Sequence, residues 1–451
     1  MKIVVFDDDP TGSQAVYGCP LLLNWDLETL RYGINHSSPL LFILINTRSI
    51  SPELSATRLV EVCRCFKKAI KLEGLTQDDF LFISRGDSTL RGHGFIEPDV
   101  LNKQLGPFDA TFHVPAFLEG GRKTIRGIHY LNDIPVHETA FAKDSIFGYS
   151  TSQLSSWLEQ KSDGIISSSN VARLDISILN SAINDNNGMK YLLHILSSMS
   201  DNLSVIVDAE SYCHLDVFAR AVKTLHPKKK FLFRSAASLV KSFADLPPLE
   251  GKLKTCSSLR LVGDCEQPKP GLVIVGSHVP LSDAQLDILM KDESCIGLEL
   301  LAMEVVRILD SPQNDLTLMN IRQEYLKKLN IIIANNYTPI LYTSRGEIKF
   351  KTSTKKIKFG ILLAKLMAQI ASDLIPKIGY IISKGGVTTQ SLFSEGLNLK
   401  LVELKGQILP GLSIVTCEID SKNSTFPVVT FPGNLGDENT LLNAYKLMKE
   451  P

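Results

Sequence analysis

Short apolar runs alternate along the chain with segments in which apolar residues recur at helical spacing. Lys2–Phe6, Leu41–Asn46 and Phe80–Ser84 are apolar enough to predict buried strands. The segment between the last two begins with Ser51 and Pro52, which suit the cap and the first turn of a helix. Strands separated by helices predict a mostly parallel sheet that helices cover on both faces.

The segment 251–270 interrupts this alternation, because glycines, prolines and charges of both signs replace the apolar pattern. We interpret it as a linker between a first domain over residues 1–250 and a second over residues 271–451. A chain of 451 residues is also too long for one ordinary core. We therefore expect an α/β fold of two domains, each a mostly parallel sheet flanked by helices.

The alternation resumes after the linker. Ser282 is expected to cap a helix over Asp283–Met290, and Ile357–Ile375 has the pattern of a long amphipathic helix. Further strands are predicted at Leu272–Gly276, Ile340–Thr343, Tyr380–Ser383, Ile414–Glu418 and Val428–Phe431.

The composition is typical of a globular protein with a sizeable core, with 44% hydrophobic and 21% charged residues. Lysine plus arginine and aspartate plus glutamate both number 48, so the formal net charge is zero. We therefore expect neither nucleic acid nor an anionic membrane as a partner. We also expect no apolar run to span a membrane, reduced cysteines, and a cytoplasmic location.

Ligands of parallel α/β sheets bind beyond the carboxyl ends of the strands, and the first predicted strand leads into an acidic loop. This loop contains Asp7, Asp8, Asp9 and Thr11. Such a cluster could accept hydrogen bonds from substrate hydroxyls, provide a general base or bind Mg²⁺. A solvated acidic turn is the alternative.

A second polar loop, with Arg85, Asp87, Ser88 and Arg91, follows the strand predicted at Phe80–Ser84. Because arginine binds carboxylates through two parallel hydrogen bonds, this loop could hold an acidic substrate. Asp87 would stay ionised beside the arginines. The alternative is an Arg–Asp pair that only ties the loop down.

Two glycine turns follow strands of the second domain. One comprises Lys384, Gly385, Gly386, Val387 and Thr388, and the other contains Gly433 and Asn434. Paired glycines let backbone N–H groups approach phosphate oxygens, and the start of a helix adds a favourable field. The P-loop spacing is absent, so each turn alone could serve packing, whereas both together indicate a nucleotide site.

The chain resembles the four-carbon acid sugar kinase family in five motifs that occur in the family's order. These motifs are Asp8-Asp9-Pro10-Thr11-Gly12, Asp87-Ser88-Thr89-Leu90-Arg91-Gly92, Ser277, Gly385-Gly386-Val387-Thr388 and Gly433-Asn434-Leu435-Gly436. The resemblance covers nearly the whole chain. It implies a sugar-acid-binding first domain, a nucleotide-binding second domain, and phosphorylation of acids such as erythronate, threonate or 3-oxo-tetronates with ATP.

The resemblance also implies roles for particular residues. Asp87 or Asp8 would be catalytic. The acid site would comprise Asp8, Asp9, Thr11, Arg85, Asp87, Ser88, Arg91 and Arg122, with Gly121 and Asp144 nearby. The ATP site would comprise Ser277, Lys384, Gly385, Gly386, Val387, Thr388, Gly433 and Asn434. The family's last motif usually has Lys-Ser where this chain has Phe431-Pro432, and Lys384 could supply the missing charge.

We expect ATP with Mg²⁺ to bind the second domain and a small sugar acid to bind the first, with closure excluding water. A homodimer is compatible with the sequence. A regulatory relative that binds ATP and sugar acids without catalysis is the alternative. The missing G-x-G-x-x-G after a strand counts against a third reading, a Rossmann-type dehydrogenase or synthase.

Overall fold

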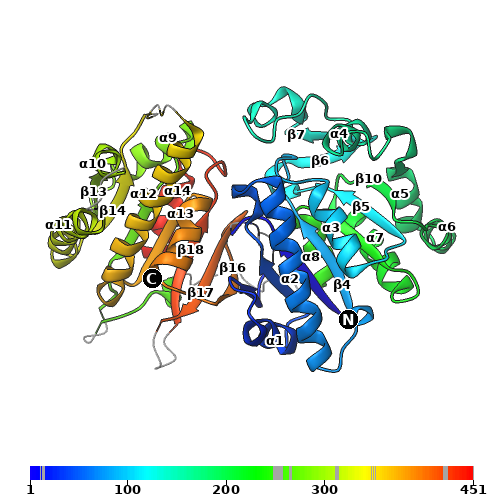
Figure 1. Cartoon of the computed structure of the whole chain (residues 1–451), viewed down its shortest axis with the longest axis horizontal. Coiled ribbons are helices and arrows are strands. Elements are labelled where there is room, and N and C mark those ends of the chain that lie inside the picture. The colour runs from blue at the N-terminus through cyan, green and yellow to red at the C-terminus, as the bar shows by residue number, and fades with distance from the viewer. Residues whose placement is uncertain are drawn as a thin grey trace. The chain divides into compact units, whose positions relative to one another are not determined.

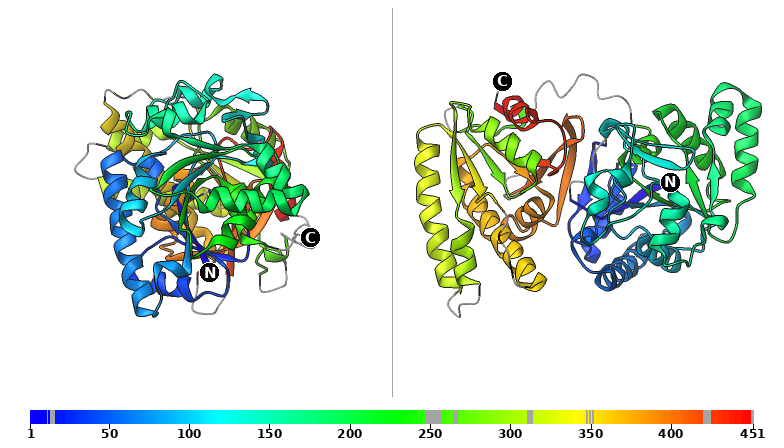
Figure 2. Two further views of the ribbon diagram at one scale, coloured as in Figure 1. Left: turned by 90° about the vertical axis from the view of Figure 1, so that its right-hand side faces the viewer. Right: turned by 90° about the horizontal axis from the view of Figure 1, so that it is seen from above.

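The structure, a computed structural model, describes residues 1–10, 12, 16–246, 257–263, 267–309, 314–346, 348, 350, 352–419 and 425–449. The chain forms two compact units, Met1–Pro248 (unit 1) and Leu249–Pro451 (unit 2) (Figure 1). In each unit, helices lie on both faces of a mostly parallel sheet (Figure 2). This arrangement confirms the predicted α/β fold.

The described strands of the unit 1 sheet all run parallel, in the order β2-β3-β1-β4-β11-β5-β10-β9. Helices cover both faces, which explains why β1, β3 and β4 read as continuous apolar runs. The strands are β1 Lys2–Asp7, β2 Cys19–Leu22, β3 Leu40–Leu44, β4 Phe80–Arg85, β5 Ala110–Val114, β9 Ala172–Leu174, β10 Leu203–Val207 and β11 Phe231–Ser235. A separate antiparallel sheet contains β6 Arg122–Ile125, β7 Ile128–Leu131 and β8 Ile134–Pro135.

Helix α2 (Pro52–Leu72) shows how local sequence sets the helix boundaries of unit 1. The Ser51 side chain accepts a hydrogen bond from the N–H of Leu54, and Pro52 occupies the first turn, as predicted. The other helices of the unit are α1 Leu27–Asn35, α3 Ile96–Leu105, α4 Leu154–Lys161, α5 Ile176–Asn184, α6 Asn186–Ser197, α7 Tyr212–Leu225 and α8 Ala237–Ala244.

The sheet of unit 2 has the strand order β13-β14-β12-β15-β18-β17-β16. The first five strands are parallel, whereas β17 and β16 continue the sheet in antiparallel pairs. The strands are β12 Gly271–Val275, β13 Cys295–Leu300, β14 Thr338–Thr343, β15 Tyr380–Lys384, β16 Leu401–Leu409, β17 Leu412–Glu418 and β18 Thr425–Phe431. The helices are α9 Pro280–Leu289, α10 Ala302–Ile308, α11 Asn314–Ala334, α12 Ser353–Leu374, α13 Gly386–Ser391 and α14 Thr440–Lys449.

The predicted cap at Ser282 is wrong. Helix α9 begins earlier, at Pro280 with Val279 as its cap residue, because proline suits a first helical turn. Ser282 lies inside the helix, and its hydroxyl donates to the hydroxyl of Ser277 at 2.9 Å. The Ser282 side chain therefore forms a hydrogen bond with the loop after β12 and does not cap the start of the helix.

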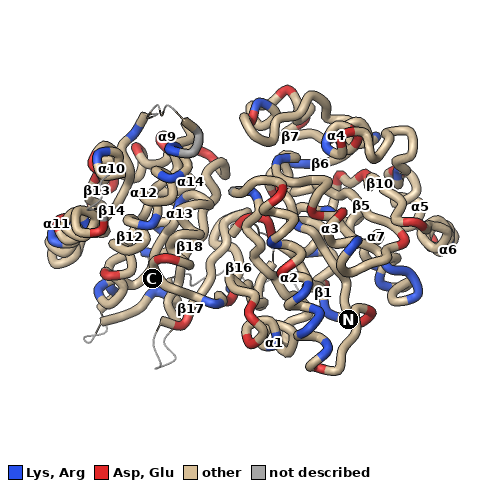
Figure 3. Tube along the Cα trace, viewed as in Figure 1, with Lys and Arg blue, Asp and Glu red and all other residues tan. Residues whose placement is uncertain are grey.

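One described helical segment, Lys355–Lys377, is long and apolar enough by composition to cross a membrane, which the sequence analysis did not expect. However, 56% of its most apolar window is buried inside the protein, as in the core helix of a globular fold. Charged residues of both signs are interspersed along both units (Figure 3).

Part of the predicted linker 251–270, namely 251–256 and 264–266, lies outside the described residues. In the described part, the N–H of Leu261 donates to the carbonyl of Gly379 at 3.1 Å. The Arg260 side chain donates to the carbonyl of Lys269 at 2.7 Å. This part of the segment is thus hydrogen-bonded within unit 2, and its role as a linker stays a prediction.

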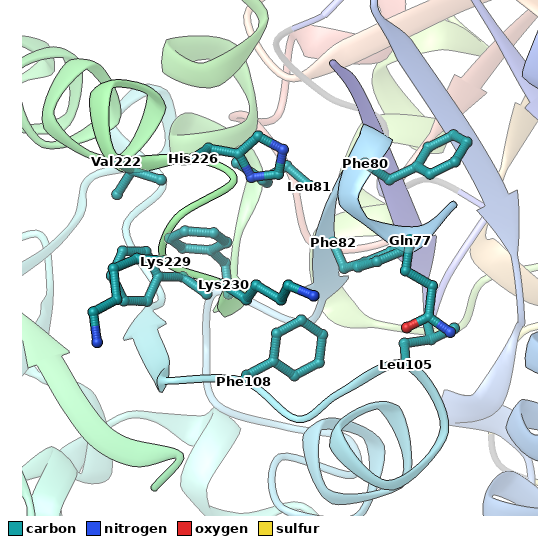
Figure 4. Close-up of a pocket in the computed structure, with 12 residues that line it drawn as sticks. Gln77, Phe80, Leu81, Phe82, Leu105, Phe108, Val222, His226, Lys229 and Lys230 are labelled. Atoms are coloured by element: carbon teal, nitrogen blue, oxygen red, sulfur yellow. The ribbon is translucent and has the colours of Figure 1, made fainter. Parts of the chain in front are cut away.

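A small cavity of about 20 Å³ lies where β4 and β11 of unit 1 begin. Phe80, Phe82, Phe108 and Lys230 are among its lining residues (Figure 4). The cavity has room for about one water molecule, and it lies at the amino ends of the strands. Ligands of parallel sheets bind at the opposite edge, so the candidate sites are sought there.

Candidate functional sites

The acidic loop of unit 1 is neutralised by two arginines from neighbouring strand ends. Arg48 binds Asp8 through both arms, with Nη2 2.6 Å from Oδ1 and Nε 3.2 Å from Oδ2. Its Nη1 lies 3.2 Å from Oδ2 of Asp9. Nη1 of Arg85 lies 3.5 Å from Asp7 and 3.4 Å from Asp8. The loop is therefore a buried ion-pair network, and the solvated turn is the wrong alternative.

Strand order explains why these groups meet. Strand β1 pairs with β3 on one side and with β4 on the other, and all three are parallel. Their carboxyl ends therefore lie side by side, so the acidic loop after β1 faces Arg48, which follows β3, and Arg85, which ends β4. The sequence analysis missed Arg48, although the rule that selected the other strand-end loops applies to it equally.

Asp7 is a fully buried member of the acidic loop, as Asp8 is. Its side chain has no exposed area, and no described residue gives Oδ2 a hydrogen bond. Burial raises the pKa of Asp7 to about 7, and Arg85 offsets this rise only in part. A Cβ atom at Gly12 would lie 2.1 Å from Oδ1 of Asp7, so only glycine lets the loop pass over this carboxyl. Thr11 lies outside the described residues.

Asp87 is held in the charged form by its neighbours. Nε of Arg91 donates to Oδ2 of Asp87 at 2.7 Å, and the Thr89 hydroxyl donates to the same oxygen. Burial alone would raise the pKa of Asp87, but Arg91 and Arg48 outweigh it and keep that pKa well below its usual range. Asp87 therefore suits orienting a hydroxyl better than a strong base role, since base strength falls with pKa.

Arg48 and Arg122 extend the cluster around Asp87. Burial lowers the pKa of Arg48, but the negative charges of Asp8, Asp9 and Asp87 raise it. The net effect keeps the pKa of Arg48 well above its ordinary value. Arg122, from β6, is buried and interacts electrostatically with Asp87. A Cβ atom at Gly120 would lie 1.9 Å from Nη1 of Arg122, so the glycine makes room for this guanidinium.

The predicted arginines thus differ in how far they are engaged. Arg85 and Arg91 are tied to carboxylates, and Nη1 of Arg91 also lies 4.0 Å from Asp144. In contrast, Arg122 forms no ion pair with a described residue, and no described residue accepts a hydrogen bond from its Nε. The Ser88 side chain is buried, and its carbonyl accepts a hydrogen bond from Nε2 of His129 at 2.8 Å.

Unit 2 contains a cavity of about 580 Å³ at the carboxyl ends of β12 and β14. This volume lies in the range of small-molecule sites. Part of the lining is apolar and includes Phe350 and Phe359, whose rings are tilted by 38° at a centroid distance of 5.0 Å, together with Leu363 and Met367. Another part of the lining is polar and includes Gly276, His278, Asp283 and Thr388.

The predicted glycine turns converge beside this cavity. A Cβ atom at Gly385 would lie 3.4 Å from Cβ of Ser277, and one at Gly433 would lie 2.9 Å from the Ser277 hydroxyl. Of the other predicted residues, Val387 and Thr388 line the cavity, and Gly386 begins α13. Asn434 follows Gly433 on the exposed side of its turn. The structure therefore brings Ser277 and both glycine turns together.

Lys384 lies behind the turns and not in the cavity lining. Its side chain is fully buried, and Nζ donates to the carbonyls of Pro432 and Gly433 at 3.3 and 3.4 Å. Nζ also lies 3.8 Å from the centroid of the Phe431 ring, on the neighbouring strand. Burial lowers the pKa of Lys384 to about 7, and the positive charge of Arg345 adds to this effect.

Comparisons with known proteins agree with this division of the chain. Residues 3–243 match the model of a sugar-binding N-terminal domain, and residues 272–441 match that of a nucleotide-binding C-terminal domain. A D-erythronate kinase of Heliobacterium modesticaldum is 29% identical over 151 residues. This match spans 32% of the present chain and 32% of that relative, about a third of each.

Two solved structures share the fold over nearly the whole chain. A Salmonella typhimurium LT2 protein, solved as a candidate tRNA synthase, has a TM-score of 0.67 and 16% identity over 98% of both chains. Haemophilus influenzae protein HI1011 has a TM-score of 0.61 and 15% identity, over 99% of this chain and 100% of its own. At such low identity the likeness shows the fold alone.

Replacing Arg48 by methionine should destabilise unit 1 by about 3–5 kcal/mol, because it leaves the buried carboxylate of Asp8 without its bidentate partner. Urea unfolding followed by tryptophan fluorescence measures this, since Trp25 and Trp157 both lie in unit 1. The control R31M, which breaks the exposed pair with Glu73, should cost much less. A loss in R48M no larger than in R31M would contradict the network.

The buried ammonium of Lys384 should make stability depend on pH. Its folded-state pKa is lowered from 10.5 to about 7, so in this window the unfolded chain binds more protons and stability should rise with pH. The expected slope is at most about 1.4 kcal/mol per pH unit. Urea unfolding by circular dichroism at pH 7.5, 8.5 and 9.5 should show this slope in the wild type relative to K384M. Parallel curves for the two proteins would contradict it.

Proposed function

Since the chain belongs to the four-carbon acid sugar kinase family, we propose that it transfers the γ-phosphoryl group of ATP to a hydroxyl of a small sugar acid. Erythronate, threonate and 3-oxo-tetronates are the first candidates, and a related hydroxy acid is the next. The observation that carries the proposal is the pair of strand-end sites, one rich in arginine and aspartate and one a cavity beside glycine turns.

Unit 1 offers the chemistry that a sugar acid needs. We propose that the substrate carboxylate binds Arg122, because this buried guanidinium, unlike Arg48, Arg85 and Arg91, forms no ion pair with a described residue. The substrate hydroxyls would bind Asp8, Asp9 and Asp87, whose oxygens accept hydrogen bonds. Arg48, Arg85 and Arg91 would hold these aspartates ionised and in place. Thr11 and Ser88 remain predicted contacts.

Unit 2 offers the two surfaces that a nucleotide needs. The apolar part of the lining, with Phe350 and Phe359, suits a base, because an aromatic ring buries a large flat surface on apolar side chains. The polar end beside Ser277, Gly385 and Gly433 suits phosphates, because glycines without side chains let a ligand approach the backbone closely, although the N–H of Gly385 itself already donates to the carbonyl of Phe431 at 2.8 Å. Lys384 would support this end by holding the carbonyls of the second turn.

We propose that Mg²⁺ enters with ATP, because Mg²⁺ in phosphoryl-transfer sites takes many of its ligands from phosphate oxygens and water. Phosphoryl transfer depends mainly on positioning and on stabilising charge. Asp87 would orient the attacking hydroxyl through its charged carboxylate. Either Asp87 or Asp8 would accept the proton as the new O–P bond forms.

The direct test is ADP release from ATP and Mg²⁺ across a panel of three- to six-carbon sugar acids, with the matching polyols as uncharged controls. A sugar acid that stimulates ADP release above the polyol of equal length supports the proposal. If ATP binds but no acid in the panel is phosphorylated, the regulatory alternative is favoured instead.

Replacing Asp87 by asparagine should lower kcat about 10²- to 10⁴-fold, because the neutral amide cannot accept the proton or orient the hydroxyl as a carboxylate does. The ATP affinity should be unchanged, since Asp87 lies in unit 1. The matched control D133N removes an exposed carboxylate that pairs with Lys123 and should keep wild-type kcat. Near-normal turnover of D87N would remove Asp87 from the mechanism.

Replacing Arg122 by glutamine should raise KM for the acid about tenfold to a hundredfold, the loss expected for a hydrogen bond between charged groups. The effect on kcat should be small, because the carboxylate is bound equally in the ground and transition states. Steady-state kinetics of R122Q test this, with R220Q as the control because Arg220 is an exposed residue of α7. An unchanged KM would mean that the substrate carboxylate binds a cation other than Arg122.

A further inference from the structure

Arg345 stands at the point where three parallel strands of unit 2 end. It follows β14, which pairs with β12, and β12 pairs in turn with β15. Nη1 of Arg345 donates to the carbonyl of Ser277, after β12, at 2.6 Å and to Oδ1 of Asp283, in α9, at 2.8 Å. Its sequence neighbours Ser344 and Gly346 both line the 580 Å³ cavity.

The edge of this guanidinium that Nε and Nη2 form has no hydrogen-bond partner among the described residues. Both atoms are shielded from solvent. These two atoms present parallel N–H groups, the edge with which arginine binds two oxygens of one phosphate or carboxylate. A structural tie between Ser277 and Asp283 needs only Nη1, so it leaves this edge without a role. Arg345 is not itself a lining residue of the cavity, and its side chain is 24% exposed although Nε and Nη2 are not, so a ligand in the cavity meets this edge only after the side chain turns towards it.

The local charge balance also indicates an anion. Burial lowers the pKa of Arg345, although Asp283 raises it, and Arg345 in turn disfavours the charged form of Lys384. Lys384 meets carbonyl groups and a phenyl ring but no carboxylate among the described residues. His278, which also faces Arg345, has its pKa lowered by burial and is a neutral ring at pH 7. Among the described residues, Asp283 is therefore the single carboxylate paired with Arg345, and none is paired with Lys384.

We propose that Arg345 binds the phosphate chain of the nucleotide through its Nε–Nη2 edge, a role that no sequence motif assigned to it. The proposal rests on the nucleotide site proposed above and names the cation of its polar end. A phosphate oxygen pair satisfies the two orphaned N–H groups, and its negative charge offsets the repulsion between Arg345 and Lys384. The base, in contrast, lies against the apolar part of the lining and does not depend on Arg345.

The test compares ligands with and without phosphates. Dissociation constants of ATP, ADP and adenosine are measured by calorimetry for the wild type, R345Q and R345K, with K291Q on the exposed surface as control. R345Q should bind ATP and ADP about tenfold to a hundredfold more weakly and adenosine within about twofold of the wild type. R345K should lie between, because it keeps the charge but loses the paired N–H groups.

Each other outcome has a distinct meaning. Equal weakening of ATP and adenosine in R345Q, with a lowered Tm, means that Arg345 only ties Ser277 to Asp283, and it overturns the inference. Unchanged ATP affinity in R345Q also overturns it. If the wild type binds neither ATP nor adenosine, the nucleotide site itself fails, which is a failure of the proposed function and not of the assignment of Arg345 within it.

Discussion

The pairing of the acidic loop with Arg48 and Arg85 is the interaction on which the site of unit 1 depends. Asp7 and Asp8 have no exposed area, and an ionised carboxylate without a partner in such a place costs several kcal/mol. The parallel order β3-β1-β4 meets this need, because it sets the loops after β3 and β4 against the loop after β1. The same geometry places Arg48 close enough to Asp87 to act on its charge.

The candidate sites of the two units differ in their charges: carboxylates gather in unit 1 and cations in unit 2. In unit 1, Arg48, Arg85 and Arg91 pair with carboxylates, so most of the charge of the cluster is balanced internally, and its carboxylate oxygens can accept hydrogen bonds from hydroxyls. In unit 2, Arg345 and Lys384 stand at the strand ends, and among the described residues only Arg345 is paired with a carboxylate, that of Asp283. A polyhydroxy acid suits the first environment and a polyphosphate suits the second. This contrast is independent of any sequence motif.

The fold was predictable from the sequence, and so were the strand-end loops that form the candidate sites, because both follow from local signals. Apolar runs of strand length, the cap at Ser51 and the polar loops after strands are all visible without tertiary information. Strand β16, which extends the sheet in an antiparallel pair with β17, was not predicted. Its residues alternate between buried and more exposed positions, so it lacks the continuous apolar run by which the other strands were recognised. Ser282 was misjudged because proline, two residues earlier, fixes the helix start more strongly than serine.

The roles of individual arginines could not be predicted, because they depend on which N–H groups the fold has already engaged. Arg85 and Arg122 look equivalent in sequence, yet Arg85 pairs with Asp7 and Asp8, whereas Arg122 forms no ion pair with a described residue. Arg345 has no motif at all, and only the structure separates its engaged Nη1 from the Nε–Nη2 edge, which has no hydrogen-bond partner among the described residues. A buried N–H group without an acceptor lowers the stability of the protein unless a ligand supplies the acceptor. The donors that have no partner within the protein are therefore the best indication of a ligand-binding role.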